Sequence, residues 1–128
     1  MDVLLYLAAG STALWGIAHL CATRGVVRGF GELTPDNRHI ITMEWIVEGV
    51  ALVALGAFIA TVTAVGHRDS GGAVSEAATA VYATAIATLV VLAVVSLFTG
   101  FRVKFLPFRL CPVIFILSAV LVALGAWI

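Results

Sequence analysis

Two carboxylates lie four residues apart inside an apolar stretch of this sequence, the run NRHIITMEWIVEG from Asn37 to Gly49. On a helix, residues at this spacing project from one side, so Glu44 and Glu48 are expected to face the same neighbour. A charge at bilayer depth costs roughly 3 kcal/mol on insertion scales. We therefore expect that one carboxylate is protonated, or that a histidine, an arginine or a metal ion neutralises the pair.

A histidine in the preceding apolar run is the first candidate partner for these carboxylates. His19 follows Ser11 and Trp15 at helical spacing, so the three side chains share one helix face. It is expected about one turn inside the same membrane boundary as Glu44. The predicted ion- or ligand-binding cluster therefore consists of His19, Glu44 and Glu48, with Trp15, Arg38, His39, Trp45 and Arg109 as supporting residues.

Three interpretations of this cluster are open. In the first, a buried glutamate–histidine or glutamate–arginine pair only fixes the register of the helices. In the second, the cluster handles a proton or a cation. In the third, a carboxylate accepts a hydrogen bond from a bound ligand.

The residues do not determine which metal or cofactor, if any, the cluster takes. His19, Glu44 and Glu48 could supply three ligands of a hard or borderline metal ion. Di-iron carboxylate bundles carry Glu-x-x-His pairs, which do not occur in this sequence. A haem held by His19 and His39 is a further alternative, and no catalytic residue is assigned.

The composition indicates a polytopic membrane protein with a single domain, residues 1–128. The chain has 128 residues, of which 62% are hydrophobic and 11% charged, and its mean hydropathy is +1.16. Soluble domains average about 25% charged residues. The formal net charge is zero, so there is no reason to expect a nucleic-acid partner.

The apolar runs predict an all-α fold, a bundle of four transmembrane helices over residues 3–22, 35–66, 75–99 and 107–128. Thr34 and Pro35 are typical of a helix start, and Pro107 suits the first turn of the last helix. Pro112 is expected to kink or loosen that helix. The connection from His67 to Ser75 is predicted to be a tight, exposed turn.

The basic residues are distributed unevenly over the short connections. The middle connection carries Arg68, whereas the first and third carry Arg24, Arg28, Arg38, Arg102, Lys104 and Arg109. The positive-inside rule therefore predicts that both termini lie outside the cell and that the cluster lies near the cytoplasmic face of the inner (plasma) membrane. Cys21 and Cys111 fall at that face, where thiols stay reduced.

Small residues at helical spacing predict close helix packing. Gly49 and Gly56 allow a neighbouring backbone to approach the second helix. The helix over 75–99 has no ionisable residue beyond its start, which predicts a wall that faces lipid or a partner. We therefore expect a homo-oligomer or a larger membrane complex.

The string NRHIITMEWIVEG followed by an apolar helix resembles small four-helix bacterial membrane proteins, which are similar in size and plan to the DoxX-type membrane proteins. The resemblance covers mainly Gly16 to Gly56. It implies no catalytic residue. The function that we predict first is an accessory or structural subunit of a membrane complex. The alternatives are a binding or transport protein for a proton, a cation or a small amphipathic ligand, and a membrane oxidoreductase subunit.

Overall fold

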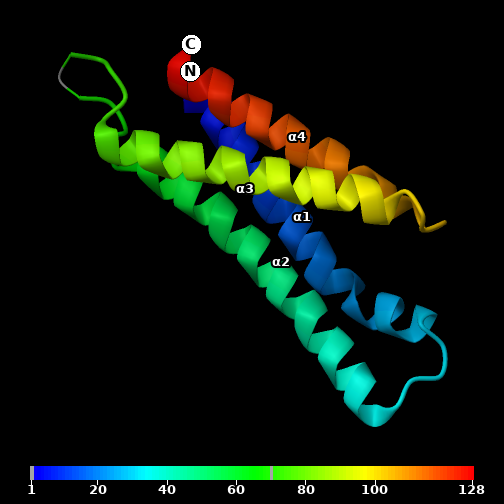
Figure 1. Cartoon of the computed structure of the whole chain (residues 1–128). Helices are drawn as coiled ribbons and strands as arrows, with labels where there is room; N and C mark the ends of the chain where they lie inside the picture. Colours follow the sequence, from blue (N-terminus) through cyan, green and yellow to red (C-terminus); the bar gives the residue numbers. More distant parts are fainter. Residues whose placement is uncertain (1, 70) are drawn as a thin grey trace.

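The computed structural model describes residues 2–69 and 71–128 of the chain. It contains the helices α1 (Asp2–Gly29), α2 (Pro35–Ala64), α3 (Glu76–Gly100) and α4 (Leu106–Trp127) (Figure 1). All four helices are long and apolar enough to cross a membrane. The predicted all-α fold with four membrane-spanning helices is therefore confirmed.

The helices begin where local sequence signals predict. The hydroxyl of Thr34 accepts a hydrogen bond from the backbone N–H of Asn37 at 3.3 Å, and α2 starts with Pro35. The hydroxyl of Ser75 caps α3 in the same way by accepting from the N–H of Ala78. These side chains satisfy backbone donors that the first turn of a helix leaves unpaired. In α4 a proline occupies the first turn, as predicted, and the helix continues through Pro112.

α1 is longer than its apolar run predicts. The run ends near Ala22, but the helix continues to Gly29. No proline interrupts this segment, and a basic residue in the last turn, here Arg28, interacts favourably with the helix dipole. Arg24 and Arg28, which the sequence analysis placed in a connection, therefore project from the surface of a helix.

α1 and α2 pack so closely that their backbones touch. A Cβ atom added to Gly16 would lie 2.6 Å from the carbonyl oxygen of Gly49. One added to Gly56 would lie 2.5 Å from the carbonyl oxygen of Ala9. Only glycine fits at these positions, so the predicted close approach along α2 is confirmed.

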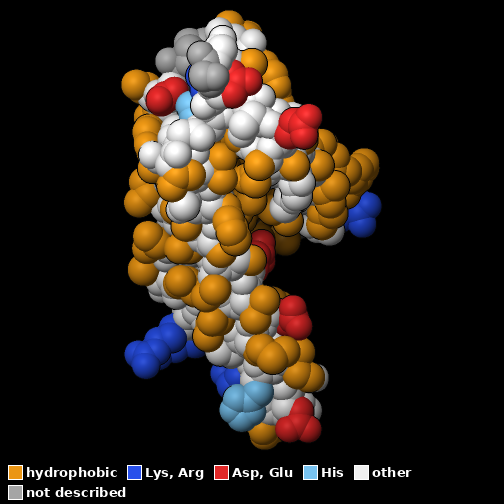
Figure 2. Space-filling view, turned by 90° about the vertical axis from the view of Figure 1, so that its left-hand side faces the viewer, with side chains coloured by type: hydrophobic (Ala, Val, Ile, Leu, Met, Phe, Trp, Pro, Cys, Tyr) orange, Lys and Arg blue, Asp and Glu red, His pale blue; other side chains and the backbone are white. Residues whose placement is uncertain are grey.

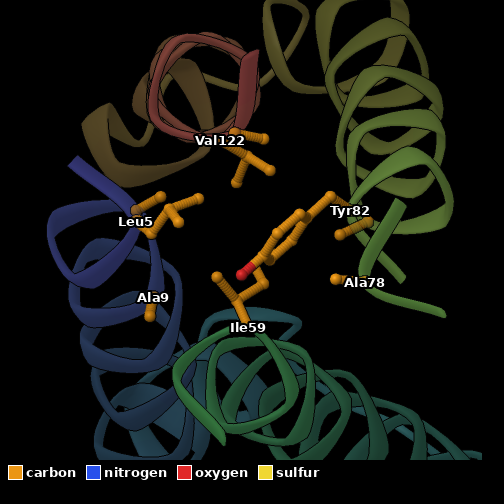
Figure 3. Close-up of a cluster of buried hydrophobic side chains, with 9 residues drawn as sticks. Leu5, Ala9, Ile59, Ala78, Tyr82 and Val122 are labelled. Carbon is orange, nitrogen blue, oxygen red and sulfur yellow. The ribbon is translucent and has the colours of Figure 1, made fainter. Parts of the chain in front are cut away.

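The main hydrophobic core joins all four helices near the two termini. Tyr82 of α3 and Ile59 of α2 point toward Leu5 of α1 and Val122 of α4, and all four side chains are fully buried (Figure 3). A second cluster lies deeper in the bundle, around Leu52, Leu89, Ala93, Cys111, Phe115 and Ala119. These clusters hold the helices together over only part of their length.

The two helix pairs diverge away from this core. The helix pair α1–α2 and the helix pair α3–α4 meet at one end of the molecule, the closed end, which carries the termini and the connection between α2 and α3. The two pairs separate toward the opposite, open end, which carries residues 29–35 and 100–106 (Figure 1). Although consecutive, α2 and α3 make little contact. Figure 2 shows the resulting notch in the surface, with acidic side chains in it and at its edge.

The connection between α2 and α3, described over residues 65–69 and 71–75, forms a hydrogen-bonded hairpin rather than a wholly exposed turn. One carboxylate oxygen of Asp69 accepts hydrogen bonds from the backbone N–H groups of Gly71 and Ala73 at 2.9 and 3.0 Å. Arg68 pairs with Val74 in an isolated bridge. His67 is only 3% exposed, so the prediction of an exposed turn was wrong for this residue. It was wrong because the hairpin folds back onto α3, where His67 contacts the ring of Tyr82.

Candidate functional site

His19 lies in the seam between α1 and α2, where the side chain is 7% exposed. The buried residues of α1 recur every three or four positions, and this spacing turns His19 toward α2 together with Gly16 and Thr23. The imidazole stacks on the indole of Trp45, with ring centroids 4.0 Å apart and planes 14° apart. The indole N–H of Trp45 also donates a hydrogen bond to the backbone carbonyl of His19 at 2.7 Å. One aromatic residue thus fixes both the ring and the backbone of His19.

Glu48 is the carboxylate that reaches this histidine. Its Oε2 lies 3.3 Å from Nε2 of His19, and its side chain is 43% exposed. The contact has the distance of an ion pair but not the direction of a hydrogen bond, since Nε2 has no hydrogen-bond partner among residues 2–69 and 71–128. We interpret the geometry as a carboxylate beside an imidazole that still has one free hydrogen-bonding position.

A pocket of about 210 Å³ opens beside this pair, between α1, α2 and the start of α4. Its wall is almost entirely apolar and includes the rings of Trp15, Trp45 and Phe108. The indole nitrogen of Trp15 is buried and has no hydrogen-bond partner in the described part of the chain. A second hollow, of about 430 Å³, shares Phe105 and Phe108 with the pocket, so the two adjoin.

The structure separates the other predicted site residues from this pocket. Glu44 is exposed and makes no ion pair within the described ranges, so the expectation that both glutamates face one neighbour was wrong. The physical reason is that Glu48 lies within reach of the one histidine of α1, whereas the side chain of Glu44, one turn nearer the start of α2, is exposed on the surface.

The remaining supporting residues lie on the surface at the open end. Arg38 and His39, on the first turns of α2, are exposed. Arg109 is also exposed, and its Nε donates to the backbone carbonyl of Val103 at 3.3 Å. Of the predicted residues, the structure therefore brings together His19, Glu48, Trp15 and Trp45.

Sequence reasoning assigned Arg109 of α4 to the site but missed Phe108 and Cys111 of the same helix. Phe108 packs edge-on against Trp45, with ring centroids 5.4 Å apart, and Cys111 lines the pocket while only 6% exposed. The sequence contained a usable signal, because Phe105 and Phe108 flank Pro107 at the start of an apolar helix. Their partners, however, come from helices distant in sequence.

A second polar group, at the closed end, was also missed. Nε2 of His67 lies 3.6 Å from a carboxylate oxygen of Asp2. The hydroxyl groups of Tyr82 and Thr63 are 3.0 Å apart, and Arg68 approaches the carbonyl oxygens at the end of α4. These contacts tie α1, α2, α3 and α4 together where the core is tightest, so we assign them a structural role.

A histidine beside a carboxylate in an apolar wall can hydrogen-bond the polar group of a ligand or exchange a proton with it. Within residues 2–69 and 71–128, no three His, Cys, Asp or Glu residues gather closely enough to hold a metal ion. Comparison of the chain with protein-family models, curated proteins and solved structures gives no match, so the resemblance to DoxX-type proteins stays a prediction.

Proposed function

We propose that this chain is a membrane-embedded binding protein for a small amphipathic molecule. The observation that carries the proposal is the pocket beside His19, the residue that Glu48 contacts from outside the pocket lining. Its walls are aromatic, and two of its lining residues, Trp15 and His19, each have a buried nitrogen atom without a hydrogen-bond partner in the described residues. Binding sites for small molecules are mostly apolar, with a few polar groups that orient the ligand.

The size of the pocket indicates the class of ligand. A cavity of about 150 Å³ lined by apolar side chains takes up benzene. The pocket of about 210 Å³ therefore has room for one aromatic ring with a short alkyl substituent, and the adjoining hollow extends that space. A hydroxyl group on the ring would accept from the indole N–H of Trp15 and pair with His19 or Glu48. The best-fitting class is accordingly an alkylated aromatic alcohol.

The experiment uses 4-hexylphenol as the probe and hexylbenzene as its matched control. The full chain, carrying Trp127→Phe so that its fluorescence comes from the two pocket tryptophans, is titrated in detergent micelles. We expect saturable quenching by 4-hexylphenol and binding of hexylbenzene about tenfold weaker, because losing one hydrogen bond to buried groups costs about 1 kcal/mol or more. Equal affinities for the two probes would count against the proposal.

Two variants test which polar group orients the ligand. Glu48→Gln keeps the shape of the side chain and removes its charge beside His19, while Glu44→Gln makes the same change at an exposed position that does not contact His19. The proposal expects Glu48→Gln, and not Glu44→Gln, to change the affinity for 4-hexylphenol. The cation-handling alternative instead expects Glu48→Gln to abolish a cation- or pH-dependent shift in melting temperature that the natural chain shows.

A second candidate function, an accessory subunit of a membrane complex, is favoured by the notch between α2 and α3. A half-exposed Glu48 in a membrane span is costly unless something covers it. A helix of a partner, or of a second copy, would do so. Mild solubilisation followed by native mass spectrometry distinguishes the candidates, since a subunit is isolated with another chain and a binding protein with a small molecule.

We also propose that the open end faces the cytoplasm, in the inner (plasma) membrane. Six of the seven Lys and Arg residues lie at that end: Arg24, Arg28, Arg38, Arg102, Lys104 and Arg109. Retention of basic residues on the cytoplasmic side supports this orientation.

A further inference from the structure

A separate pocket lies between the last turns of α1 and the first turns of α2. Its volume is about 190 Å³, and it is lined by Thr23, Arg24, Val27, Arg28, Arg38 and Thr42. It is thus more polar than the ligand pocket, and its charged groups are all basic. None of these residues lines the pocket beside His19.

The fold places the three arginines around one space. Arg24 and Arg28 are four residues apart on α1, so their side chains lie one above the other. A short connection, in which Gly31 has a φ of +75°, reverses the chain and brings Arg38 of α2 opposite them. The arrangement depends on the extension of α1 past its apolar run.

Within residues 2–69 and 71–128, no acidic side chain forms an ion pair with the arginines of this pocket. The ion pairs in the described part of the chain are His19–Glu48 and His67–Asp2, and neither involves these arginines. The hydroxyl groups of Thr23 and Thr42 donate to the backbone carbonyls of His19 and Arg38. In the part of the chain that the structure describes, the guanidinium groups therefore remain as the available donors of this pocket. Like charges around one space repel each other, and an anion between them would relieve that repulsion.

We infer that this pocket binds a phosphate group, and that the phosphate is the headgroup of an anionic phospholipid. Guanidinium groups match the oxygen atoms of a phosphate with paired hydrogen bonds. A basic pocket between transmembrane helices at the cytoplasmic side is the arrangement by which proteins recognise anionic lipid headgroups.

The depth of the pocket and the surface beside it favour a lipid over free phosphate. α1 has 28 residues and is therefore about 42 Å long, which exceeds the roughly 30 Å of the hydrocarbon core, so its last turns reach the headgroup layer. One and two turns deeper than Thr42, on the same side of α2, lie Ile46 and Val50, which are 42% and 53% exposed. An acyl chain attached to the bound phosphate would lie along these side chains.

The test measures lipid binding to the full chain in detergent micelles by native mass spectrometry and by melting temperature. The probes are dioleoylphosphatidylglycerol, dioleoylphosphatidylcholine and inorganic phosphate. We expect the phosphatidylglycerol to bind and raise the melting temperature, and the phosphatidylcholine to do neither. The double variant Arg24→Gln, Arg28→Gln should weaken phosphatidylglycerol binding by at least about tenfold, because each basic residue near an anionic lipid surface contributes about 1 kcal/mol.

The matched control is the double variant Arg102→Gln, Lys104→Gln, which removes the same charge from the same end of the molecule but outside the pocket. It should change the affinity less than about twofold. Equal losses in the two double variants would mean diffuse surface charge and would overturn the inference. Stabilisation by inorganic phosphate alone, with no further effect of the phosphatidylglycerol, would overturn the assignment to a lipid.

Discussion

Trp45 holds His19 in two ways at once, since its indole stacks on the imidazole at a centroid distance of 4.0 Å and its N–H donates to the backbone carbonyl of the same residue at 2.7 Å. The stacked pair lies between the α1–α2 seam and the pocket beside His19. Because Trp45 also contacts Phe108 of α4, it packs against both helix pairs.

Replacing Trp45 by phenylalanine should separate these two roles. The ring still stacks on His19, but the hydrogen bond to the carbonyl is lost, which costs about 1 kcal/mol of unfolding free energy. Trp45→Ala loses the stacking and the contact with Phe108 as well, so its melting temperature should be clearly lower than that of Trp45→Phe. Equal melting temperatures for the two variants would show that the aromatic contacts contribute little.

The close contact of α1 and α2 at Gly56 gives a prediction whose control is a second glycine of the same protein, Gly10. Gly56→Ala places a methyl group 2.5 Å from the carbonyl oxygen of Ala9, so α1 and α2 must separate, and we expect a loss of about 1–3 kcal/mol in unfolding free energy. Gly10→Ala adds the same atom to a helix where nothing lies within 4 Å. This control should be neutral or stabilising, because alanine favours a helix more than glycine does. Denaturant titration in mixed micelles measures both changes.

The features that the sequence predicted correctly depend mostly on residues that are close to one another in the chain. The hydrogen bond between Thr34 and Asn37 that starts α2 spans three positions, and the apolar runs that define the four spans are continuous in the chain. The pairing of His19 with Glu48, across two helices, was also among the expected contacts, because few polar residues lie at that depth.

The features of the site that the sequence could not predict depend on the angle between the helix pair α1–α2 and the helix pair α3–α4. Glu44 and Glu48 are equivalent by helical spacing, but only Glu48 finds a polar partner on α1. The pocket needs Phe108 and Cys111 from α4, and their position relative to Trp45 follows from how far the pairs diverge. The predicted end of α1 was wrong because the end of an apolar run shows where a helix leaves the bilayer. The residue at which the helix itself ends depends on the helix propensity of the residues that follow.

The proposed orientation can be checked by labelling from one side of the membrane. In a chain without its natural thiols (Cys21→Ser, Cys111→Ala), we expect Ala73→Cys to react with an impermeant maleimide added outside intact cells. Glu32→Cys should react only after the membrane is opened. Both positions are exposed, so a difference in labelling reports sidedness rather than burial. The opposite pattern would invert the topology and place the arginine pocket in the outer leaflet.

The His19–Glu48 pair can be measured by a double-mutant cycle with His19→Leu and Glu48→Gln. His19→Leu leaves a carboxylate without its partner, and we expect it to lower the unfolding free energy by about 1–2 kcal/mol. This is less than for a fully buried pair, because the Glu48 side chain is 43% exposed. Glu48→Gln keeps a hydrogen-bonding side chain of the same shape beside the imidazole and should cost less or be neutral.

The double variant decides whether the two residues act on each other. If they do, adding Glu48→Gln to His19→Leu should recover part of the lost stability, because the unpaired charge is removed. The coupling free energy should then be of the order of 1 kcal/mol. Glu44→Gln in place of Glu48→Gln is the control, since Glu44 lies one turn away, is exposed and lies outside the pair. Additive effects of His19→Leu and Glu48→Gln would contradict the pair.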